Sequence, residues 1–365
     1  MTQFTPTPAR PAPVSEAGLV GWLRKNLFSS IPNSIVSLFA IWVAWQVVST
    51  VFSWAIWNAD WIGSTRADCS GEGACWVFIG VRMKTFIYGF YPPELLWRPN
   101  TVFAVLAALL AWMMLPKTPF KKWVIIASLT AFPVFAYFML YGGSFGLTTV
   151  PTSRWGGILL TLVLAIVGIV AALPIGIVLA LGRRSDMPIV RFVSTIFIEF
   201  WRGVPLITVL FMASVMLPLF FSGGTSVDRL LRALIGITLF QAAYIAEVVR
   251  GGLQAIPKGQ YEAADALGLS YWQKTNLIVL PQALKIMIPG LVNTLISLFK
   301  DTTLVLIIGL GDLLAMVRQA LADPAWLGFP TEGYVFAALM FWIFCFSMSR
   351  YSQYLERRLN TGHKN

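Results

Sequence analysis

Long apolar runs separated by short polar segments dominate this chain. A helix needs about 20 apolar residues to cross the hydrocarbon core of a bilayer. On that criterion the sequence predicts eight membrane-spanning helices, near 31–57, 99–115, 123–141, 156–182, 192–221, 230–249, 286–310 and 333–350. The pattern therefore predicts an all-α membrane protein.

Composition supports lipid as the solvent of this chain. Of its 365 residues, 57% are hydrophobic and 12% are charged. A soluble domain has about 45–50% apolar and about 25% charged residues. The net charge is +11, an excess that membrane proteins commonly place in cytoplasmic loops. No basic cluster is interleaved with aromatic residues, so we expect a lipid bilayer around the chain and no nucleic-acid partner.

Basic residues set the predicted orientation. If the N-terminus is inside, the inner segments contain 17 Lys and Arg residues and the outer segments contain 7. This asymmetry predicts that both termini are cytoplasmic. The outer segment contains Arg66, Arg82, Lys84 and Arg98, which weaken the asymmetry locally.

The pattern of spans and polar segments divides the chain into four parts. The N-terminal stretch is rich in Pro, Thr and Ala, as disordered segments are. The predicted parts are a cytoplasmic disordered tail at 1–30, a three-helix membrane extension at 31–150 with a periplasmic loop at about 58–98, a core at 151–355 with a cytoplasmic loop at 250–289, and a cytoplasmic tail at 356–365.

Cysteine and histidine are scarce. Cys69 and Cys75 lie in the sequence CSGEGAC of the predicted outer loop. In an oxidising periplasm they can form a disulfide; the alternative is two free thiols in a flexible loop. Cys345 lies within the last span, and His363 lies in the tail. We therefore expect no metal site and no cofactor bound by this chain.

The loop at 250–289 departs from the membrane pattern. It has about forty residues of mixed polarity, whereas connections between helices in bundles usually need about 2–8. The stretch 261–267 favours a short helix, Gly268 is a helix stop, and Ser270 can cap a second helix. The sequence thus predicts two short helices bent at a glycine, where a side chain would clash.

The same loop carries a spaced motif. The pattern is EAA, three residues, G, nine residues, I, one residue and LP. Every position is met, by Glu262, Ala263, Ala264, Gly268, Ile278, Leu280 and Pro281. The stretch resembles the EAA loop of binding-protein-dependent ABC importer permeases. Its flanks EVVRGGLQAIPKGQ and FKDTTLVLIIGL, and EFWRGVPLI at 199–207, resemble permeases of the polar amino acid type.

The resemblance covers about 155–355 and implies a type I ABC importer permease core of five helices. The three preceding helices resemble those of the longer permease subunits of general L-amino acid transporters. The resemblance implies uptake of L-amino acids across the bacterial inner membrane. It also implies an ATPase dimer that binds ATP and Mg, a periplasmic amino-acid binding protein, and a second permease subunit that is a related but different chain.

In this family the loop supplies a coupling helix that sits in a groove of the ATPase. The small side chains of Ala263, Ala264 and Ala266 would leave a low-relief face for such a partner. Glu262 would satisfy first-turn amides or pair with a basic residue of the partner. The alternative is an amphipathic surface loop with no partner. Since the chain has no GxxxxGK[ST] motif, we expect it not to hydrolyse ATP itself.

Polar residues inside the predicted spans are candidates for the substrate path, because ionisable groups at membrane depth are costly and commonly line a cavity or pair. They are Glu199, Arg202, Gln241, Lys300 and Asp301, which we expect near the midplane. Arg202 can hold a carboxylate with two hydrogen bonds, and Asp301 can hold an ammonium group. Alternatively, Glu199 and Arg202 pair with each other, and Lys300 and Asp301 lock helices together. Tyr244 and Glu247 are assigned to packing and gating.

Two other functions make distinct predictions. A secondary transporter driven by protons or sodium would have two similar halves, and the loop at 250–289 has no second copy. A membrane enzyme would need a cluster such as paired histidines or a Ser/His set, and the chain has one histidine. Both alternatives are therefore weaker than the importer permease.

Overall fold

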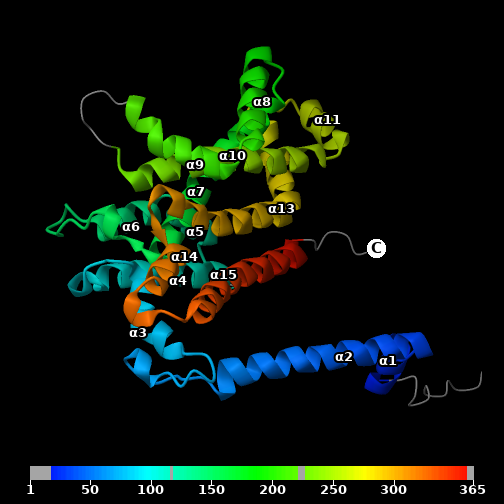
Figure 1. The fold of residues 1–365 in the computed structure, drawn as a ribbon. Coiled ribbons are helices and arrows are strands. Elements are labelled where there is room, and N and C mark those ends of the chain that lie inside the picture. Colours follow the sequence, from blue (N-terminus) through cyan, green and yellow to red (C-terminus); the bar gives the residue numbers. More distant parts are fainter. Residues whose placement is uncertain (1–17, 116–117, 221–226, 360–365) are drawn as a thin grey trace, which may run out of the picture. The chain divides into compact units, whose positions relative to one another are not determined.

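The computed structural model describes residues 18–115, 118–220 and 227–359 (Figure 1). Most of the predicted N-terminal tail and His363 lie outside these residues. The chain divides into two compact units, Met1–Phe78 and Ile79–Asn365. The boundary predicted at 150/151 falls inside the second unit.

Helices dominate both units, as the sequence predicts. Six helices of the described residues are long and apolar enough to cross a membrane, and up to eight spans result if two bent helix pairs each count as one. Among the same residues there is one β-strand, the two-residue β1 (Gly311–Asp312). The predicted all-α membrane fold is therefore confirmed.

The first unit contains a short helix before its long apolar one. Helix α1 spans Gly18–Asn26, and α2 spans Ile31–Phe52 and continues into a π turn at Ser53–Trp57. Ser30 caps α2, because its hydroxyl oxygen accepts a hydrogen bond from the Asn33 N–H at 3.3 Å. The prediction of disorder throughout 1–30 is therefore wrong for the nine residues of α1, where apolar side chains recur at helical spacing.

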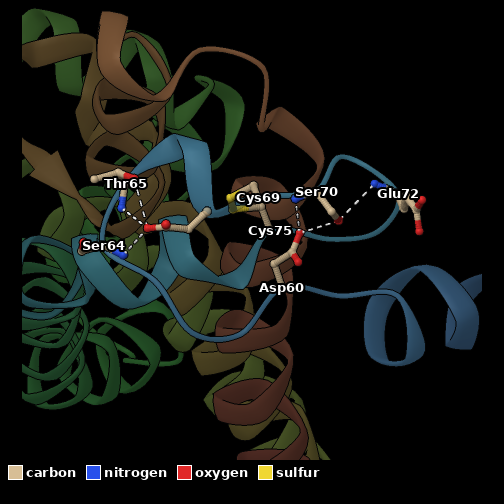
Figure 2. The surroundings of a disulfide bond; sticks show 8 residues. Asp60, Ser64, Thr65, Cys69, Ser70, Glu72 and Cys75 are labelled. Carbon is tan, nitrogen blue, oxygen red and sulfur yellow. Dashed lines mark hydrogen bonds between the residues drawn. A yellow bond between two sulfur atoms is a disulfide. The ribbon is translucent and has the colours of Figure 1, made fainter.

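The loop of this unit that is predicted to face outward is closed by a disulfide between Cys69 and Cys75 (Figure 2). The Cα atoms are 5.6 Å apart, which is within the usual range for bridged cysteines. The Asp60 carboxylate accepts hydrogen bonds from the backbone N–H of Ser70 at 2.7 Å and from its hydroxyl at 2.8 Å. A 3-10 turn at Arg66–Asp68 lies just before the bridge. The free-thiol alternative is therefore not what the structure shows.

The disulfide predicts a redox-dependent labelling pattern. In a Cys345→Ser background, a thiol-reactive probe should label the chain only after a reductant is added, because both remaining sulfur atoms are bonded to each other. Mass spectrometry of the 58–78 peptides measures the outcome. Labelling of the unreduced protein at Cys69 or Cys75 would show that the bridge is absent.

The second unit follows helix α3, which spans Trp76–Tyr88 and crosses the boundary between the units. The further helices are α4 (Trp97–Met114), α5 (Lys121–Leu129), α6 (Ala131–Tyr141), α7 (Gly157–Arg183), α8 (Pro188–Gly203), α9 (Leu206–Val215), α10 (Arg229–Gln254), α11 (Lys258–Ala266), α12 (Tyr271–Lys274), α13 (Leu280–Asp301), α14 (Leu313–Leu321) and α15 (Pro330–Leu359). Short 3-10 turns lie at Pro93–Leu95, Thr152–Arg154, Leu217–Phe220, Thr302–Ile308 and Pro324–Trp326, and a π turn lies at Thr275–Val279.

Helix α10 is the centre of this unit. It packs against α7, α8, α9 and α13, while α15 packs against α13 and α14. One part of the core joins α7, α9 and α10 through residues such as Leu160, Leu210 and Ile237. A second part, nearer the C-terminal ends of α7 and α10, includes Ile245 and Met287. Helices α4 and α6 of the predicted extension contribute Val102, Phe132 and Leu140 to the first part of this core.

Three predicted spans differ from the structure. The span at 192–221 is two helices, α8 and α9, bent by 101° at a break that contains Pro205, because proline lacks the N–H that would continue the helix. The span at 123–141 is α5 and α6, bent by 44°. The span at 286–310 starts too late, since a continuous helical stretch runs over Tyr271–Ile308.

The predicted outer loop at 58–98 is also more ordered than its composition indicates. Arg82 on α3 forms an ion pair with Asp323, the residue directly before the 3-10 turn Pro324–Trp326. Arg98 is fully buried at the start of α4, where it donates to the carbonyl oxygens of Met139 at 2.7 Å and Thr148 at 2.9 Å. A cation at the C-terminal end of a helix stabilises its free carbonyls, here those of α6.

Gly157 at the start of α7 and the buried Asp312 of β1 lie side by side. Gly157 has φ +63°, and a Cβ atom there would lie 2.1 Å from the Phe86 carbonyl oxygen. The backbone of Gly157 also forms a parallel bridge with Asp312. The Asp312 carboxylate caps α14 by accepting from the N–H groups of Leu314 and Ala315, both at 3.1 Å. Burial raises the pKa of Asp312 to about 6, and these hydrogen bonds offset part of the rise.

The raised pKa predicts a pH dependence of stability. A proton binds Asp312 more tightly in the folded state, so this stabilisation is complete below the unfolded pKa and is lost as the pH rises through about 6. Lowering the pH from 7 to 5 should stabilise the protein by about 1 kcal/mol relative to Asp312→Asn, which still caps the helix. Thermal unfolding in detergent measures the difference. An identical pH response in both proteins would contradict the prediction.

Candidate functional site

The connection between α10 and α13, residues 255–279, is folded into two short helices, α11 and α12, and a π turn. Gly268 ends α11 with φ +70°, a conformation that glycine adopts without the cost of a Cβ. Its N–H donates to the Asp265 carbonyl at 2.9 Å, and the next N–H, of Leu269, donates to the Ala264 carbonyl at 3.2 Å. These bonds form the glycine-dependent cap of a helix C-terminus. We call residues 255–279 the connecting segment.

The second helix of the connecting segment starts at a capping box. The Ser270 hydroxyl oxygen accepts from the Gln273 N–H, and the Gln273 side chain accepts from the Ser270 N–H at 2.9 Å. Lys274 then forms an ion pair with Asp265 at 2.5 Å, which holds α12 against α11. The bend predicted at Gly268 is therefore confirmed. The helices on its two sides, α11 and α12, are held against each other by this ion pair.

The expected clash at Gly268 is wrong. A Cβ atom there would meet no atom within 4 Å, so the need for glycine comes from the positive φ and not from lack of space. The alanines also differ from the expectation: Ala264 is fully buried in its own chain, while Ala263 is exposed. Glu262 is exposed in the middle of α11, beyond the first-turn amides of that helix.

The last three motif residues do not lie in a free loop. Helix α12 passes through the π turn into α13 without a break. Ile278 lies in that turn, and Leu280 and Pro281 are the first residues of α13. Pro281 has no N–H to donate to the preceding turn, and the π turn lies directly before it. The motif thus ends inside the continuous helical stretch Tyr271–Ile308.

An exposed apolar surface lies at the bend. Leu267 is 76% exposed, Trp272 is 64% exposed and Leu277 is 70% exposed, and Tyr271 is next to them in sequence and half-exposed. We call these four residues the bend patch. Sequence reasoning missed it, since it selected small alanines as the contact face. Clustered exposed apolar residues of this kind are typical of protein interaction sites.

Hydrogen bonds connect α11 to the ends of several long helices. The Tyr261 hydroxyl donates to the Leu253 carbonyl of α10 at 3.1 Å and accepts from Arg184, directly after α7, at 3.2 Å. Gln282 of α13 donates to the Gln260 side chain at 3.1 Å. A force on α11 therefore reaches α7, α10 and α13 through direct contacts.

A second group of functional candidates is a charge cluster of Arg183, Glu199, Arg202, Glu247 and Arg250. Glu247 of α10 is its centre, at 2.6 Å from Arg183, 2.8 Å from Arg250 and 3.6 Å from Arg202. Arg183 also binds Glu199 at 2.7 Å. The cluster has three positive and two negative groups, which leaves an excess of one positive charge.

The cluster joins three helices at one end of the second unit. Arg183 is the last residue of α7, Arg202 is near the end of α8, and Glu247 lies seven residues before the end of α10. At 1.5 Å per residue, Glu247 is about 10 Å from that end. The midplane position expected of Glu199 and Arg202 stays a prediction. The pairing considered for these two residues is wrong, because Glu199 binds Arg183 and Arg202 lies beside Glu247.

Arg202 is the least constrained arginine of the cluster around Glu247. Its side chain is 36% exposed, and its guanidinium lies over the ring of Tyr244 at 5.7 Å from the centroid. This arrangement is a cation–π contact. With one long ion-pair contact to Glu247, Arg202 retains donors for an anionic group.

The other predicted path residues lie apart from this cluster. Gln241 is buried, and its side chain donates to the Thr294 carbonyl of α13 at 3.0 Å, so it ties α10 to α13. Lys300 is exposed and Asp301 is half-buried at the end of α13. Within the described ranges no ion pair joins Lys300 or Asp301 to another helix, so the helix lock expected of them is absent there.

A family model matches the part of the chain that contains these residues. Residues 172–361 match the model described as "Binding-protein-dependent transport system inner membrane component". This region contains the connecting segment and the charge cluster. The chain belongs to this family. It is a permease subunit of an ABC importer, a multi-span protein of the bacterial inner membrane that works in a complex with an ATPase and a substrate-binding protein.

The permease is similar to relatives over nearly its full length. It is 59% identical to the inner membrane amino-acid ABC transporter permease protein YhdY of Escherichia coli, and the match covers 97% of each chain. It is 41% identical to the glutamate/glutamine/aspartate/asparagine transport system permease protein BztC of Rhodobacter capsulatus, again over 97% of each chain. The crystal structure of an amino acid ABC transporter with histidines has 28% identity, a TM-score of 0.49, and covers 54% of the permease and 90% of that chain.

Sequence reasoning missed Arg183 and Arg250 of the permease and assigned Glu247 to gating without its partners. The signal for Glu247 and Arg250 was present, since the two are three residues apart on one helix. Arg183 gave no such signal, because its partners are on α8 and α10. Its sequence context is that of an ordinary basic residue at the end of a span.

Proposed function

We propose that this chain is the permease subunit of an ATP-driven importer of L-amino acids, and that the connecting segment transmits movement from a separate ATPase. The bend patch carries this proposal. It exposes large apolar side chains on a capped, ion-paired segment, and that segment is bonded to α7, α10 and α13. A partner that binds two states of the permease with different affinity can drive it between them.

The motif residues have separate roles in this proposal. Glu262, Ala263 and the bend patch contact the ATPase, whereas Ala264 packs inside the permease and Gly268 sets the bend. Ile278, Leu280 and Pro281 join the docking helices to α13. The ATPase dimer binds ATP and Mg, and this chain binds neither.

Both the relatives of this chain and the charged residues of the proposed path favour an amino acid as the substrate. Of the two full-length relatives, YhdY is named for amino acids in general and BztC for glutamate, glutamine, aspartate and asparagine. A zwitterion needs an anion partner and a cation partner. Arg202, with the excess positive charge of its cluster, attracts the carboxylate. Asp301 is the proposed partner of the ammonium group, while Gln241 and Lys300 shape the path and Glu199 holds Arg183 in the cluster.

The proposed assembly has four kinds of component. They are this chain, a second permease subunit that is related but different, an ATPase dimer, and a periplasmic amino-acid binding protein. Both termini of this chain are cytoplasmic, so the connecting segment faces the ATPase and the disulfide loop faces the periplasm. This orientation agrees with the distribution of basic residues.

Uptake by the reconstituted complex tests the proposed function. Proteoliposomes containing all the components and ATP inside should accumulate radiolabelled L-amino acids only when the binding protein is outside. Omitting ATP or Mg should stop uptake. Accumulation driven by a proton or sodium gradient without ATP would instead support the secondary transporter.

Asp301→Asn tests the proposed ammonium partner. The substitution removes the negative charge and keeps the shape of the side chain, so we expect the complex to assemble and most uptake to be lost. Asp186→Asn is the control, because Asp186 is a fully exposed carboxylate in the turn before α8. Unchanged uptake in Asp301→Asn would place this residue outside the path, and loss of the assembled complex would assign it to structure.

A further inference from the structure

Helix α1 leaves an apolar face exposed within the described part of the chain. Leu19 is 77% exposed, Val20 is 57% exposed and Trp22 is 58% exposed. Residues three and four apart lie on the same side of a helix, so Leu19, Trp22 and Leu23 form one face. Gly21 is the one buried residue of α1 and lies on the opposite side. The helix therefore turns its smallest side chain inward and its large apolar side chains outward.

Two basic residues flank this apolar face. Arg24 is four residues after Val20, and Lys25 is three residues after Trp22, so the two cations lie at its two edges. Both are exposed, and among the described residues no ion pair engages either of them. The polar Asn26 ends the helix, where its side chain donates to the Trp22 carbonyl at 2.8 Å. Since α1 contains no acidic residue, the helix presents an apolar face with two uncompensated positive charges.

Two hydrogen bonds hold the end of α1 beside the first turns of α2 (Figure 1). The Ser37 hydroxyl donates to the Leu27 carbonyl at 2.7 Å. The Asn33 side chain donates to the Asn26 carbonyl at 3.3 Å. Both donors lie within about 10 Å of the start of α2, at 1.5 Å per residue. The chain thus doubles back between the two helices, and α1 lies at the level of the first two turns of α2.

The first turns of α2 are placed at the depth of the lipid headgroups. With its π turn, α2 forms a candidate membrane span of 27 residues, Ile31–Trp57. This helix is about 40 Å long, whereas the hydrocarbon core is about 30 Å thick. The donors Asn33 and Ser37 are polar, while residues 38–48 contain one polar residue, Gln46. The helix end that holds α1 is therefore the part that extends out of the hydrocarbon.

We propose that α1 is an interfacial helix that binds an anionic membrane surface. Leu19, Trp22 and Leu23 insert among the acyl chains just below the headgroups, a level at which tryptophan is enriched. Arg24 and Lys25 reach the lipid phosphates from the two edges of the inserted face. Apolar burial and attraction to anionic lipids both contribute to binding by such a helix. A zwitterionic surface offers the first contribution without the second, so phosphatidylglycerol should hold α1 more firmly than phosphatidylcholine does.

Spin labelling of the full chain tests the proposal. In a Cys345→Ser background, Cys69 and Cys75 are bonded to each other, so Leu19→Cys carries the label. The protein is placed in nanodiscs of phosphatidylcholine, alone or mixed with an equal amount of phosphatidylglycerol. The measured quantity is the ratio of the label's collision rates with oxygen, which concentrates in lipid, and with a water-soluble nickel chelate. We expect this ratio to be several-fold higher in the discs that contain phosphatidylglycerol.

Two further label positions give the reference values. Asp186→Cys lies in the fully exposed turn before α8 and reports a label in water. Leu339→Cys is exposed on the apolar helix α15 and reports a label in lipid. With phosphatidylglycerol present, the ratio at position 19 should approach that at Leu339. A ratio equal to that at Asp186 in both kinds of disc would overturn the proposal. An immobilised label at position 19 that does not respond to the lipid would show that protein covers α1, and would also overturn it.

The charges have a matched control. Arg24→Gln combined with Lys25→Gln should remove the effect of phosphatidylglycerol at position 19. Arg357→Gln combined with Arg358→Gln removes two exposed charges from the last turn of α15 and should leave the effect unchanged. Equal loss in both double variants would show that net charge matters and the location on α1 does not, which would contradict the proposal.

Salt gives a measurement that needs no further variant. Raising the ionic strength screens charges at a membrane surface, so the ratio at position 19 in phosphatidylglycerol discs should fall, while that at Leu339 stays constant. A ratio at position 19 that is insensitive to salt would overturn the role assigned to Arg24 and Lys25. None of these outcomes depends on uptake, so they are independent of the proposed transport function.

Discussion

Gly268→Val is expected to abolish uptake while the chain still inserts into the membrane. A β-branched residue is a steric outlier at φ +70°, and a left-handed backbone costs an L-residue about 1–2 kcal/mol. The space around Gly268 is open, so the effect comes from the backbone alone. Relief of that strain would shift α12 and the bend patch, and less ATPase should co-purify with the permease.

Two matched variants separate the bend from other effects. Gly268→Asn adds a side chain that tolerates the left-handed region, so it should retain most uptake. Gly259→Val adds the same bulk within α11, where the space is also open and the φ is that of a helix. Equal loss in all three variants would show that bulk on this surface matters and that the bend does not.

Glu247→Gln is the second substitution with a large expected effect. Glu247 is the common acceptor of Arg183, Arg202 and Arg250, and its side chain is 15% exposed. Removing one member of a buried pair lowers the free energy of unfolding by about 3–5 kcal/mol. We expect a somewhat smaller loss here, because Glu247 is partly exposed. Three arginines would then repel one another where α7, α8 and α10 meet, and uptake should be lost.

Glu199→Gln is the control for Glu247. Glu199 binds Arg183 alone among the described residues, and its side chain is 56% exposed. Exposed ion pairs are worth about 0–1 kcal/mol, so this variant should transport nearly as the wild type does. Uptake and the midpoint of thermal unfolding in detergent are compared between the two variants. Equal effects of the two substitutions would contradict the central role assigned to Glu247.

The sequence predicted those parts of the fold that depend on local composition. The apolar runs at 31–57, 156–182 and 230–249 correspond to α2, α7 and α10, because hydropathy over 20 residues measures what a membrane helix needs. The helix ends at Gly268 and Ser270 were also predictable, since capping depends on a few neighbouring residues.

The missed features depend on contacts between distant residues. Hydropathy summed over 192–221 does not register direction, so it did not show the 101° bend between α8 and α9. Glu199 and Arg202 have the spacing of a helical pair, but Arg183 is a nearer partner for Glu199 in the fold. Arg98 was assigned to a polar outer segment and Asp312 was not selected at all, whereas tertiary packing buries both.

Site-specific photo-cross-linking at the bend patch tests the central claim most directly. A photoreactive amino acid at Trp272, which is 64% exposed, should cross-link to the ATPase in intact cells, and the yield should change when the ATPase is held in its ATP-bound state. The same amino acid at Leu339, exposed on the apolar surface of α15, should give no such product. Failure to cross-link at Trp272 in a complex that transports amino acids would contradict the assignment of residues 255–279 as the coupling element.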